Sequence, residues 1–248
     1  MIHVDAVQRR FVQGRGRQAR VVQAVAGASF RAADGRITGL LGSNGAGKTT
    51  TLRMVAALLV PDQGQLQVDG IDVVARPAAA LARLGVLSDA RGLYPRLSAR
   101  ENIVYHGRLH GMGAAQANVR AQALAKLLDM QPLLDRRTDG FSQGERMKTA
   151  LARALVHDPP NIILDEPTNG LDVMATRALR DTLRRLRDDE GKCIVFSTHI
   201  MQEVERLCDH VVVMAGGRTV AEGPVGELCA RCGTTDFEQA FVGLAFPA

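Results

Sequence analysis

The sequence contains few cysteines, and their placement excludes a disulfide-stabilised fold. Its four cysteines, among 248 residues, are too few and too unevenly placed for a disulfide framework in a chain of this length. Cys229 and Cys232 form a C-x-x-C pair, but a structural zinc needs four ligands, and no second pair or nearby histidine cluster supplies the rest. We therefore expect reduced cysteines and no metal site at this pair.

Long apolar segments are also missing. No apolar run approaches the roughly 18 residues that a membrane-spanning helix needs. Even the most apolar segment, residues 54–60, is flanked by Arg53 and Pro61. The N-terminal residues include the acidic Asp5 and have no apolar core of a secretory signal. We expect a chain that does not span a membrane and stays in the cytoplasm.

Lysine is scarce, although the chain is basic. Of 31 basic residues only four are lysines, and 26 acidic residues leave a formal net charge of +5. An arginine-rich surface could attract anionic lipid, nucleic acid or nucleotide, but a solvated surface is the simpler interpretation. With 46% hydrophobic and 23% charged residues, the composition is that of a globular protein. The length suits one α/β domain with an insertion.

The order of the apolar segments predicts an α/β fold. Residues 2–7 and 21–30 read as strands of an antiparallel edge sheet, and residues 37–41 form a continuous apolar strand that runs into a glycine-rich turn. Residues 162–164 and 193–196 are apolar without alternation, as in strands that are covered on both faces. The core sheet is therefore expected to be mostly parallel.

The segment from about residue 89 to residue 140 has a helical pattern. Ser98 and Glu101 form a capping box that opens one helix. Leu124, Leu127 and Leu128 mark a second, amphipathic helix. We expect a small helical subdomain inserted into one domain that spans residues 1–232, followed by a C-terminal tail of residues 233–248.

A phosphate-binding loop is the first motif that carries chemistry. Residues 42–49 match G-x-x-x-x-G-K-[ST] between a buried strand and a helix, whose apolar face is predicted to run from Leu52 to Leu59. The glycines let backbone N–H groups point at phosphate oxygens, and the helix dipole adds positive potential. Lys48 supplies a charge for the β- and γ-phosphates, and Thr49 offers a hydroxyl to Mg²⁺. The predicted nucleotide-binding residues of this segment are Gly42, Ser43, Asn44, Gly45, Ala46, Gly47, Lys48, Thr49 and Thr50.

Polar residues end two of the predicted core strands. Asp165 and Glu166 follow residues 162–164, and two carboxylates beside an apolar core are costly unless a cation or water occupies the site. Asp165 is predicted to hold Mg²⁺, usually through water, and Glu166 to polarise the attacking water. His199 follows the strand at residues 193–196, where a side chain at the C-terminal edge of a parallel sheet faces the ligand crevice. We predict that it contacts the γ-phosphate.

Four segments together resemble the motifs of the ABC-type ATPase family. They are the phosphate loop, residues 141–145 (Phe-Ser-Gln-Gly-Glu), residues 164–172 (Leu-Asp-Glu-Pro-Thr-Asn-Gly-Leu-Asp) and residues 197–199 (Ser-Thr-His), in the family's order and spacing. The resemblance covers roughly residues 1–225. It implies a P-loop NTPase core with a mostly parallel sheet, an antiparallel β edge subdomain and an inserted helical subdomain. It also implies Mg²⁺-dependent hydrolysis of ATP coupled to transport.

The resemblance assigns further residues to the ATP site. Ser142, Gln143 and Gly144 match the signature segment, which completes the ATP site of a second copy, so that two chains sandwich two nucleotides. Phe11 falls where the family places the aromatic ring that stacks on adenine. Hydrolysis then removes a phosphate that both chains hold and loosens the dimer, which is differential binding between two states.

Two positions depart from the family's usual pattern. Asp89 stands where the family usually has glutamine; its carboxylate can ligate Mg²⁺ but adds negative charge beside the phosphates. The signature reads Ser-Gln-Gly-Glu, so that Gln143 and Glu145 replace a glycine and a glutamine. With residues 92–97 (Gly-Leu-Tyr-Pro-Arg-Leu), these features resemble the sodium-exporter, NatA-like branch of bacterial ABC exporters.

The family resemblance implies a motor subunit at the inner face of the cell membrane. It would form a homodimer, or pair with a closely related ATPase, and bind separate integral membrane permease subunits, with sodium export as one expected function and no nucleic acid partner. An alternative is a soluble ABC-type ATPase of translation or DNA repair, but such members carry two domains or long coiled-coil insertions. A small-molecule P-loop kinase would leave Ser142 and His199 without a purpose. The sequence does not identify the transported species.

Overall fold

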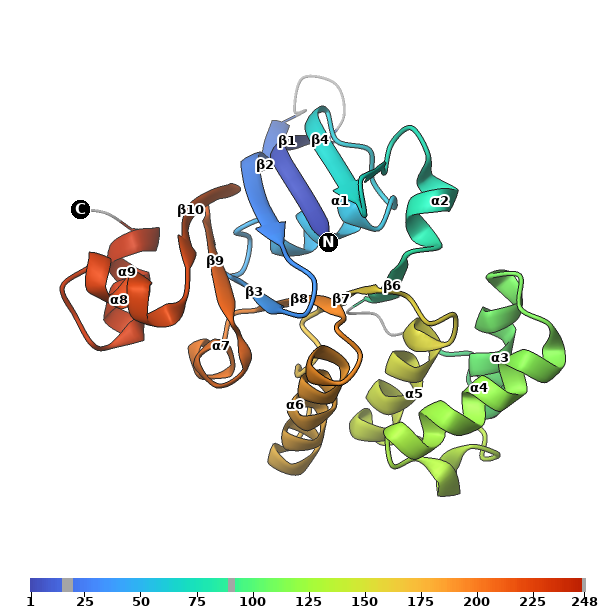
Figure 1. The fold of residues 1–248 in the computed structure, drawn as a ribbon. Helices are drawn as coiled ribbons and strands as arrows, with labels where there is room; N and C mark the ends of the chain where they lie inside the picture. Colours follow the sequence, from blue (N-terminus) through green and yellow to red (C-terminus); the bar gives the residue numbers. More distant parts are fainter. Residues whose placement is uncertain (15–19, 89–91, 247–248) are drawn as a thin grey trace.

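The computed structural model describes residues 1–14, 20–88 and 92–246, whose strands join into one mixed sheet (Figure 1). The strand order is β5-β4-β1-β2-β10-β9-β3-β8-β7-β6. The strands are β1 (Ile2–Gln13), β2 (Arg20–Ala32), β3 (Ile37–Leu41), β4 (Gln63–Val68), β5 (Ile71–Asp72), β6 (Leu84–Leu87), β7 (Asn161–Asp165), β8 (Cys193–Thr198), β9 (His210–Ala215) and β10 (Arg218–Gly223).

The helices connect most of the strands, and helices lie against both faces of the parallel strands (Figure 1). They are α1 (Lys48–Val55), α2 (Pro77–Leu81), α3 (Ala99–Leu109), α4 (Ala114–Leu127), the short 3₁₀ helix η2 (Gln131–Leu133), α5 (Gln143–Leu155), α6 (Val173–Asp188), α7 (Met201–Leu207), α8 (Val225–Arg231) and α9 (Phe237–Ala245). None of the helices in the described ranges is both long enough and apolar enough to cross a membrane.

The parallel half of the sheet agrees with the sequence prediction. Strands β9, β3, β8, β7 and β6 pair with one another in parallel, and β1, β2, β4 and β5 pair antiparallel. Strand β10 lies between the two halves, antiparallel to β9 and parallel to β2. Alternate residues of one strand enter different cores: Ile162 and Leu164 face the α5–α6 side, whereas Ile163 faces the α1 side. Both faces are therefore buried, which explains why these strands are apolar without alternation.

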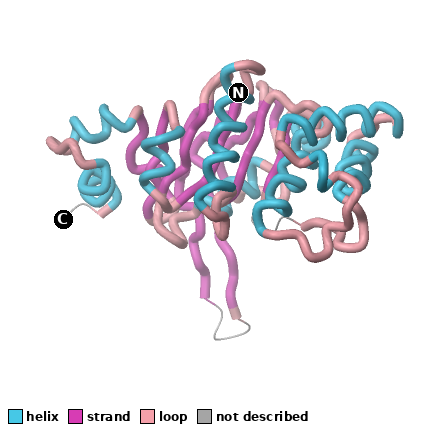
Figure 2. Tube along the Cα trace, turned by 90° about the horizontal axis from the view of Figure 1, so that it is seen from below, coloured by secondary structure: helices cyan, strands magenta, loops and turns pink. Residues whose placement is uncertain are grey.

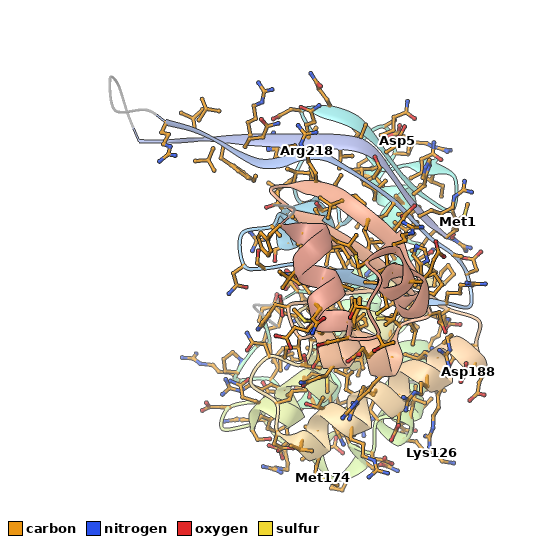
Figure 3. All side chains as sticks on the ribbon, turned by 90° about the vertical axis from the view of Figure 1, so that its left-hand side faces the viewer. Met1, Asp5, Lys126, Met174, Asp188 and Arg218 are labelled. Atoms are coloured by element: carbon orange, nitrogen blue, oxygen red, sulfur yellow. The ribbon has the colours of Figure 1, made fainter. Side chains whose placement is uncertain are left out.

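The β1–β2 hairpin extends beyond the sheet (Figure 2). Strand β1 pairs with β4 only as far as Gln8, so that the outer part of the hairpin, with Phe11 opposite Val22 and Val12 opposite Val21, pairs only with itself. Figure 3 shows this hairpin leaving the β-rich half that holds Met1 and Asp5, away from the helical half that holds Lys126 and Met174.

The helical insertion lies where the sequence predicts it. Helices α3 and α4 pack with α5 in one core, whose buried residues include Ile103, Leu124 and Leu151. The predicted capping box is present: Ser98 Oγ accepts a hydrogen bond from Glu101 N at 3.1 Å, and Glu101 Oε2 accepts one from Ser98 N at 2.7 Å. The described part of residues 89–140 therefore forms a helical subdomain.

Helix α1 is shorter than its apolar periodicity predicts. It ends at Val55 because Ala57 adopts a left-handed conformation with φ of +54°. The N–H of Leu58 then donates to the carbonyl of Arg53 at 2.9 Å, and that of Ala57 donates to the carbonyl of Met54 at 3.0 Å, which is a Schellman cap. The prediction that Leu59 lies on the helix is wrong.

The C-terminal segment contains a packed helix. Within the predicted tail of residues 233–248, helix α9 buries Phe237 and Phe241 in a cluster with Leu228 of α8 and Val211 of β9. Asp236 caps this helix by accepting a hydrogen bond from Glu238 N at 2.9 Å.

Candidate functional site

The phosphate loop joins β3 to α1 with a backbone that requires glycine at two positions. Gly47 caps α1 with φ of +100°, and a Cβ there would lie 2.7 Å from the carbonyl oxygen of Ala24. A Cβ on Gly42 would lie 2.5 Å from the carbonyl oxygen of Met214. The loop therefore packs tightly against the neighbouring strands. Residues 48–50 of the first turn of α1 line the pocket, and the free N–H groups of a helix N-terminus favour anions.

The loop forms one wall of an open pocket of about 480 Å³. The other walls come from β2 and from the segments that follow β7 and β8. The lining residues are Val22, Gln23, Ala24, Asn44, Gly45, Ala46, Gly47, Lys48, Thr49, Thr50, Glu166, Asn169 and His199. The structure thus brings most of the predicted site residues from three distant parts of the sequence into one cavity.

Lys48 is the buried cation of this pocket, with only 5% of its side chain exposed. Its Nζ donates to the carbonyl oxygens of Gly42 at 2.7 Å and Ser43 at 3.3 Å, and lies 3.4 Å from Oε1 of Glu166. These contacts satisfy an ammonium group that would otherwise be costly to bury. They also hold it at the mouth of the loop, where phosphate oxygens could become its partners.

Glu166 contacts both Lys48 and the histidine from the neighbouring strand. Its Oε2 lies 2.9 Å from Nδ1 of His199, and its side chain is 14% exposed. The backbone of Glu166 is left-handed, with φ of +47°, which is uncommon for a residue with a side chain. Strained backbone of this kind is concentrated at functional sites because the surrounding contacts must maintain it.

Asp165 lies at the end of β7, beside the loop, and is 5% exposed. Its Oδ1 accepts hydrogen bonds from Thr49 Oγ1 at 3.0 Å and from Ser197 Oγ at 2.6 Å. This set of oxygen atoms fits Mg²⁺, which is held in phosphate-transfer sites by one or two protein carboxylates together with phosphate oxygens and water. No cluster of three or more His, Cys, Asp or Glu residues suited to a metal occurs in the described ranges.

The predicted signature residues lie away from this pocket. Ser142 is exposed and caps α5: its Oγ accepts from Glu145 N at 3.2 Å, and Glu145 Oε2 accepts from Ser142 N at 2.7 Å. Gly144 faces α6, because a Cβ there would lie 3.4 Å from Cβ of Ala175. None of Ser142, Gln143 and Gly144 lines the pocket of the same chain.

Phe11 lies on the β1–β2 hairpin, next to a residue of the pocket. Phe11 is half-buried on β1, its ring lies under the Arg9 guanidinium at 5.2 Å, and it pairs with the pocket residue Val22 without lining the pocket itself. Asp89 lies outside the described residues. Ser88, before it, lines a small space with Asp165.

Two residues were missed by the sequence predictions. Asn169 lines the pocket, and Ser197 bonds to both Asp165 and Glu166 from β8. Both belong to motifs that the sequence displays, in Pro167-Thr168-Asn169 and Ser197-Thr198-His199. The missing signal was the strand register, which places Ser197 directly opposite Asp165.

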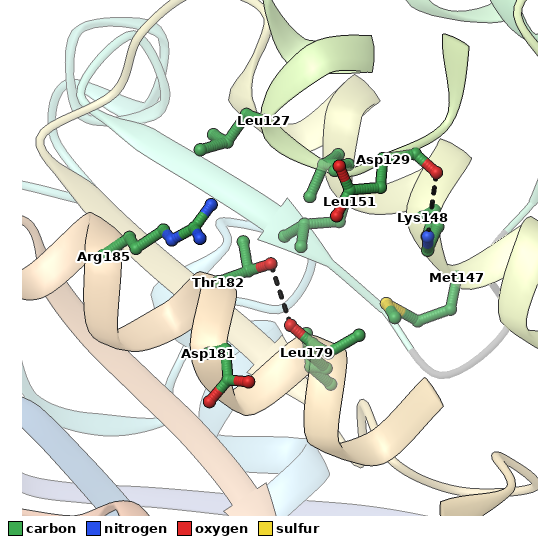
Figure 4. Close-up of a pocket in the computed structure, with 11 residues that line it drawn as sticks. Leu127, Asp129, Met147, Lys148, Leu151, Leu179, Asp181, Thr182 and Arg185 are labelled. Carbon is green, nitrogen blue, oxygen red and sulfur yellow. Dashed lines mark hydrogen bonds between the residues drawn. The ribbon is translucent and has the colours of Figure 1, made fainter. Parts of the chain in front are cut away.

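A second pocket, of about 170 Å³, lies among α4, α5 and α6 (Figure 4). Two of its polar groups have partners nearby: Lys148 Nζ donates to the carbonyl of Asp129 at 3.0 Å, and Thr182 Oγ1 donates to the carbonyl of Ala178 at 2.9 Å. The pocket contains none of the predicted site residues.

A third cavity, of about 630 Å³, forms a groove beside the helical subdomain. Its lining residues are Ala82, His110, Met112, Gln116, Val119, Arg120, Ala123, Val156, His157 and Asp158. The rings of His110 and His157 are stacked with centres 3.6 Å apart. Both ring nitrogen atoms of His157 are buried, and the backbone of Leu84 lies beside the ring as a weak hydrogen-bond partner. Burial lowers the pKa of His157 to about 4, so its ring is neutral at pH 7.

Comparison with known proteins finds relatives that match most of the chain. The family model described as "ABC transporter" matches residues 25–169, more than half of the chain. Among curated proteins, the chain is 42% identical to "ABC transporter ATP-binding protein NatA" of Bacillus subtilis, over 98% of this chain and 97% of that protein. It is also 42% identical to "Nod factor export ATP-binding protein I" of Paraburkholderia xenovorans, over 83% of this chain and 67% of the relative.

Solved structures share the fold. "Structure of ATP binding subunit of ABC transporter" superimposes with a TM-score of 0.84 at 26% identity, over 98% of both chains. "Dimeric Structure of MJ0796, a Bacterial ABC Transporter Cassette" gives a TM-score of 0.81 at 23% identity, over 90% of this chain and 98% of the other. The second likeness, at lower identity, concerns the fold alone.

Proposed function

Since the chain belongs to the ABC transporter ATP-binding family, we propose that it is the Mg²⁺-dependent ATPase motor of an exporter. The observation that carries this proposal is the convergence of Lys48, Glu166 and His199 on one pocket at the phosphate loop. The purified chain should release phosphate from ATP, and this release should stop when Mg²⁺ is removed with EDTA. Phosphate release that is unaffected by EDTA would contradict the metal requirement.

The proposed hydrolysis assigns a separate task to each group. The loop N–H groups and the Lys48 ammonium bind the β- and γ-phosphates. The Glu166 carboxylate orients the attacking water and accepts its proton, and His199 fixes that carboxylate through the 2.9 Å contact while it faces the γ-phosphate. Thr49 and Asp165 would hold Mg²⁺, which supplies positive charge to the phosphates when it is bound.

The absence of the signature residues from the lining of the pocket supports a site shared by two copies. Ser142 is exposed at the N-terminus of α5, where the helix dipole attracts negative charge, yet its own chain presents no phosphate loop to it. We propose that two chains pair head to tail, each offering Ser142, Gln143 and Gly144 to the ATP of the other. Phe11 would then stack on adenine at the hairpin edge of the pocket.

The Ser142→Arg variant tests this pairing. It should bind ATP like the wild type when dilute, because Ser142 serves the opposite chain, but it should lose ATP-dependent dimerisation in the Glu166→Gln background. Light scattering coupled to gel filtration measures the dimer. Ser142→Ala removes the same helix cap without adding bulk, which costs about 1 kcal/mol, and it controls for loss of the cap. Dimer formation by Ser142→Arg equal to that of Glu166→Gln alone would contradict a role in closure.

The groove beside the helical subdomain supports pairing with a membrane subunit. It combines apolar side chains, such as Met112 and Val119, with the two buried nitrogen atoms of His157. The Leu84 backbone can bond to only one of these nitrogen atoms, so the other is unpaired in the part of the chain that the structure describes. Unpaired buried polar atoms are costly, so a partner segment that offers both apolar contact and a hydrogen bond would stabilise the groove. We propose a cytoplasmic segment of a separately encoded permease as this partner.

Val119→Asp tests the groove. Val119 is 68% exposed at its edge, and a carboxylate there would oppose an apolar partner segment. The variant should sediment with membranes at least about tenfold less than the wild type when the adjacent membrane-protein genes are co-expressed, as expected for a buried charge without a partner. Val242→Asp, on α9 and 50% exposed, is the matched control. Equal losses in the two variants would contradict docking at the groove.

Export is the proposed direction of transport, with sodium as the first cargo to test. Relatives are named for the export of Nod factor and for daunorubicin resistance, so their names do not share one cargo. The cargo is proposed to be selected by the membrane subunits. A translation or DNA-repair role is not favoured, because these relatives are named for export or drug resistance.

A further inference from the structure

The side chain of Ser197 joins the two carboxylates of the candidate site. It lies on β8, is completely buried, and pairs in register with Asp165 of β7. Its Oγ donates to Oδ1 of Asp165 at 2.6 Å and accepts from the backbone N–H of Glu166 at 3.0 Å. One hydroxyl therefore uses both its donor and its acceptor capacity on two successive residues.

One of these two hydrogen bonds is made by Glu166, whose backbone is strained. Glu166 has φ of +47°, a conformation that residues with side chains rarely adopt without support. The backbone N–H of Glu166 is directed to Ser197 Oγ, so the hydroxyl helps to maintain this conformation. The same conformation directs the Glu166 carboxylate toward Lys48 and His199, at 3.4 Å and 2.9 Å.

The hydrogen bond from Ser197 also fixes the orientation of the Asp165 carboxylate. Oδ1 of Asp165 accepts from both Ser197 and Thr49, which directs one carboxylate oxygen to the protein and leaves Oδ2 for other ligands. Residues that hold a metal-binding carboxylate through a hydrogen bond tune its affinity and geometry. Ser197 thus links the orientation of Asp165 to that of Glu166.

From this geometry we propose that Ser197 is a positioning residue, which holds the Glu166 carboxylate and the Asp165 carboxylate in the relative placement that hydrolysis needs. The inference rests on the proposed ATPase function. It concerns the catalytic step rather than nucleotide affinity, because the loop and Lys48, which bind the phosphates, make no bond to Ser197.

Ser197→Ala tests the proposal, with steady-state kinetics and metal titration as readouts. We expect kcat to fall by about 10- to 100-fold, as for other residues that orient a site ligand, while KM for ATP changes by less than about threefold. The Mg²⁺ concentration that half-saturates the binding of a fluorescent ATP analogue should also rise, a readout that needs no turnover. Ser197→Thr keeps the hydroxyl and should restore most of kcat.

A buried hydroxyl elsewhere gives the matched control. Thr182 on α6 is buried, and its hydroxyl donates to the carbonyl of Ala178 in the same helix (Figure 4). Thr182→Val should lower the unfolding midpoint without changing kcat or the Mg²⁺ requirement. If Ser197→Ala does not fold, Ser197→Cys, with a weaker donor of similar size, must show the loss of kcat.

The outcomes separate this inference from the proposed function. Wild-type kcat in Ser197→Ala, or in Ser197→Cys if the alanine variant does not fold, would overturn the positioning role while leaving the ATPase assignment intact. An equal loss of kcat in Thr182→Val would overturn it as well, since a general loss of stability would then explain the effect. Failure of the wild type to hydrolyse ATP would instead contradict the function itself.

Discussion

Replacing Glu166 with glutamine is expected to lower ATP hydrolysis by on the order of 100-fold or more, the loss expected when a catalytic base is removed. The amide keeps the size of the side chain but cannot accept the proton of the attacking water. Lys48 and the loop remain in place, so ATP should still bind. The variant should therefore accumulate as an ATP-bound dimer.

Phosphate release and gel filtration with ATP measure the two effects of Glu166→Gln. Glu205→Gln, an exposed position on α7, makes the same chemical change outside the pocket and should behave like the wild type. Turnover in Glu166→Gln close to that of the wild type would show that another group acts as the base.

Lys48→Ala is expected to weaken ATP binding itself. The ammonium is buried at the loop, and a charged hydrogen bond to phosphate typically contributes enough for an affinity loss of about 10- to 100-fold. The substitution also leaves Glu166 without its cation at 3.4 Å, so that carboxylate would repel the phosphates. Hydrolysis should fall together with affinity.

Equilibrium binding of a fluorescent ATP analogue measures this loss for Lys48→Ala. Lys126→Ala, on the exposed side of α4 at the far end of the molecule (Figure 3), removes the same charge and controls for the change in net charge. Unchanged affinity in Lys48→Ala would mean that the nucleotide binds elsewhere.

Local patterns predicted the core of the fold because each carries its own physical reason. The parallel strands are apolar without alternation since both of their faces are buried, and the helical insertion begins at a capping box that is present in the structure. The end of α1 could not be predicted in this way. The Schellman cap places alanine, Ala57, at the position where glycine is usual, so the sequence carries no stop signal there. The apolar helical spacing also continues beyond the cap to Leu59.

Candidate site residues could be predicted where they belong to a recognisable sequence motif. Contacts that depend on the pairing of two strands could not be predicted in this way. The phosphate loop, Asp165, Glu166 and His199 were predicted from the sequence, and the structure places them together, while their roles stay predictions. Ser197 was not predicted, because its contacts with Asp165 and Glu166 depend on the register between β7 and β8, which cannot be read from a local sequence pattern. The roles of Ser142, Gln143 and Gly144 depend on a second chain and stay predictions.

The central claim is that the phosphate pocket of one chain hydrolyses ATP only when the Ser142 segment of another chain completes it. The most direct test is phosphate release per mole of wild-type chain, measured over a wide range of protein concentration at saturating ATP and Mg²⁺. Specific activity should rise with concentration and level off where light scattering of Glu166→Gln shows complete dimer. Constant specific activity across the monomer–dimer transition would contradict the claim, because each chain would then hydrolyse ATP alone.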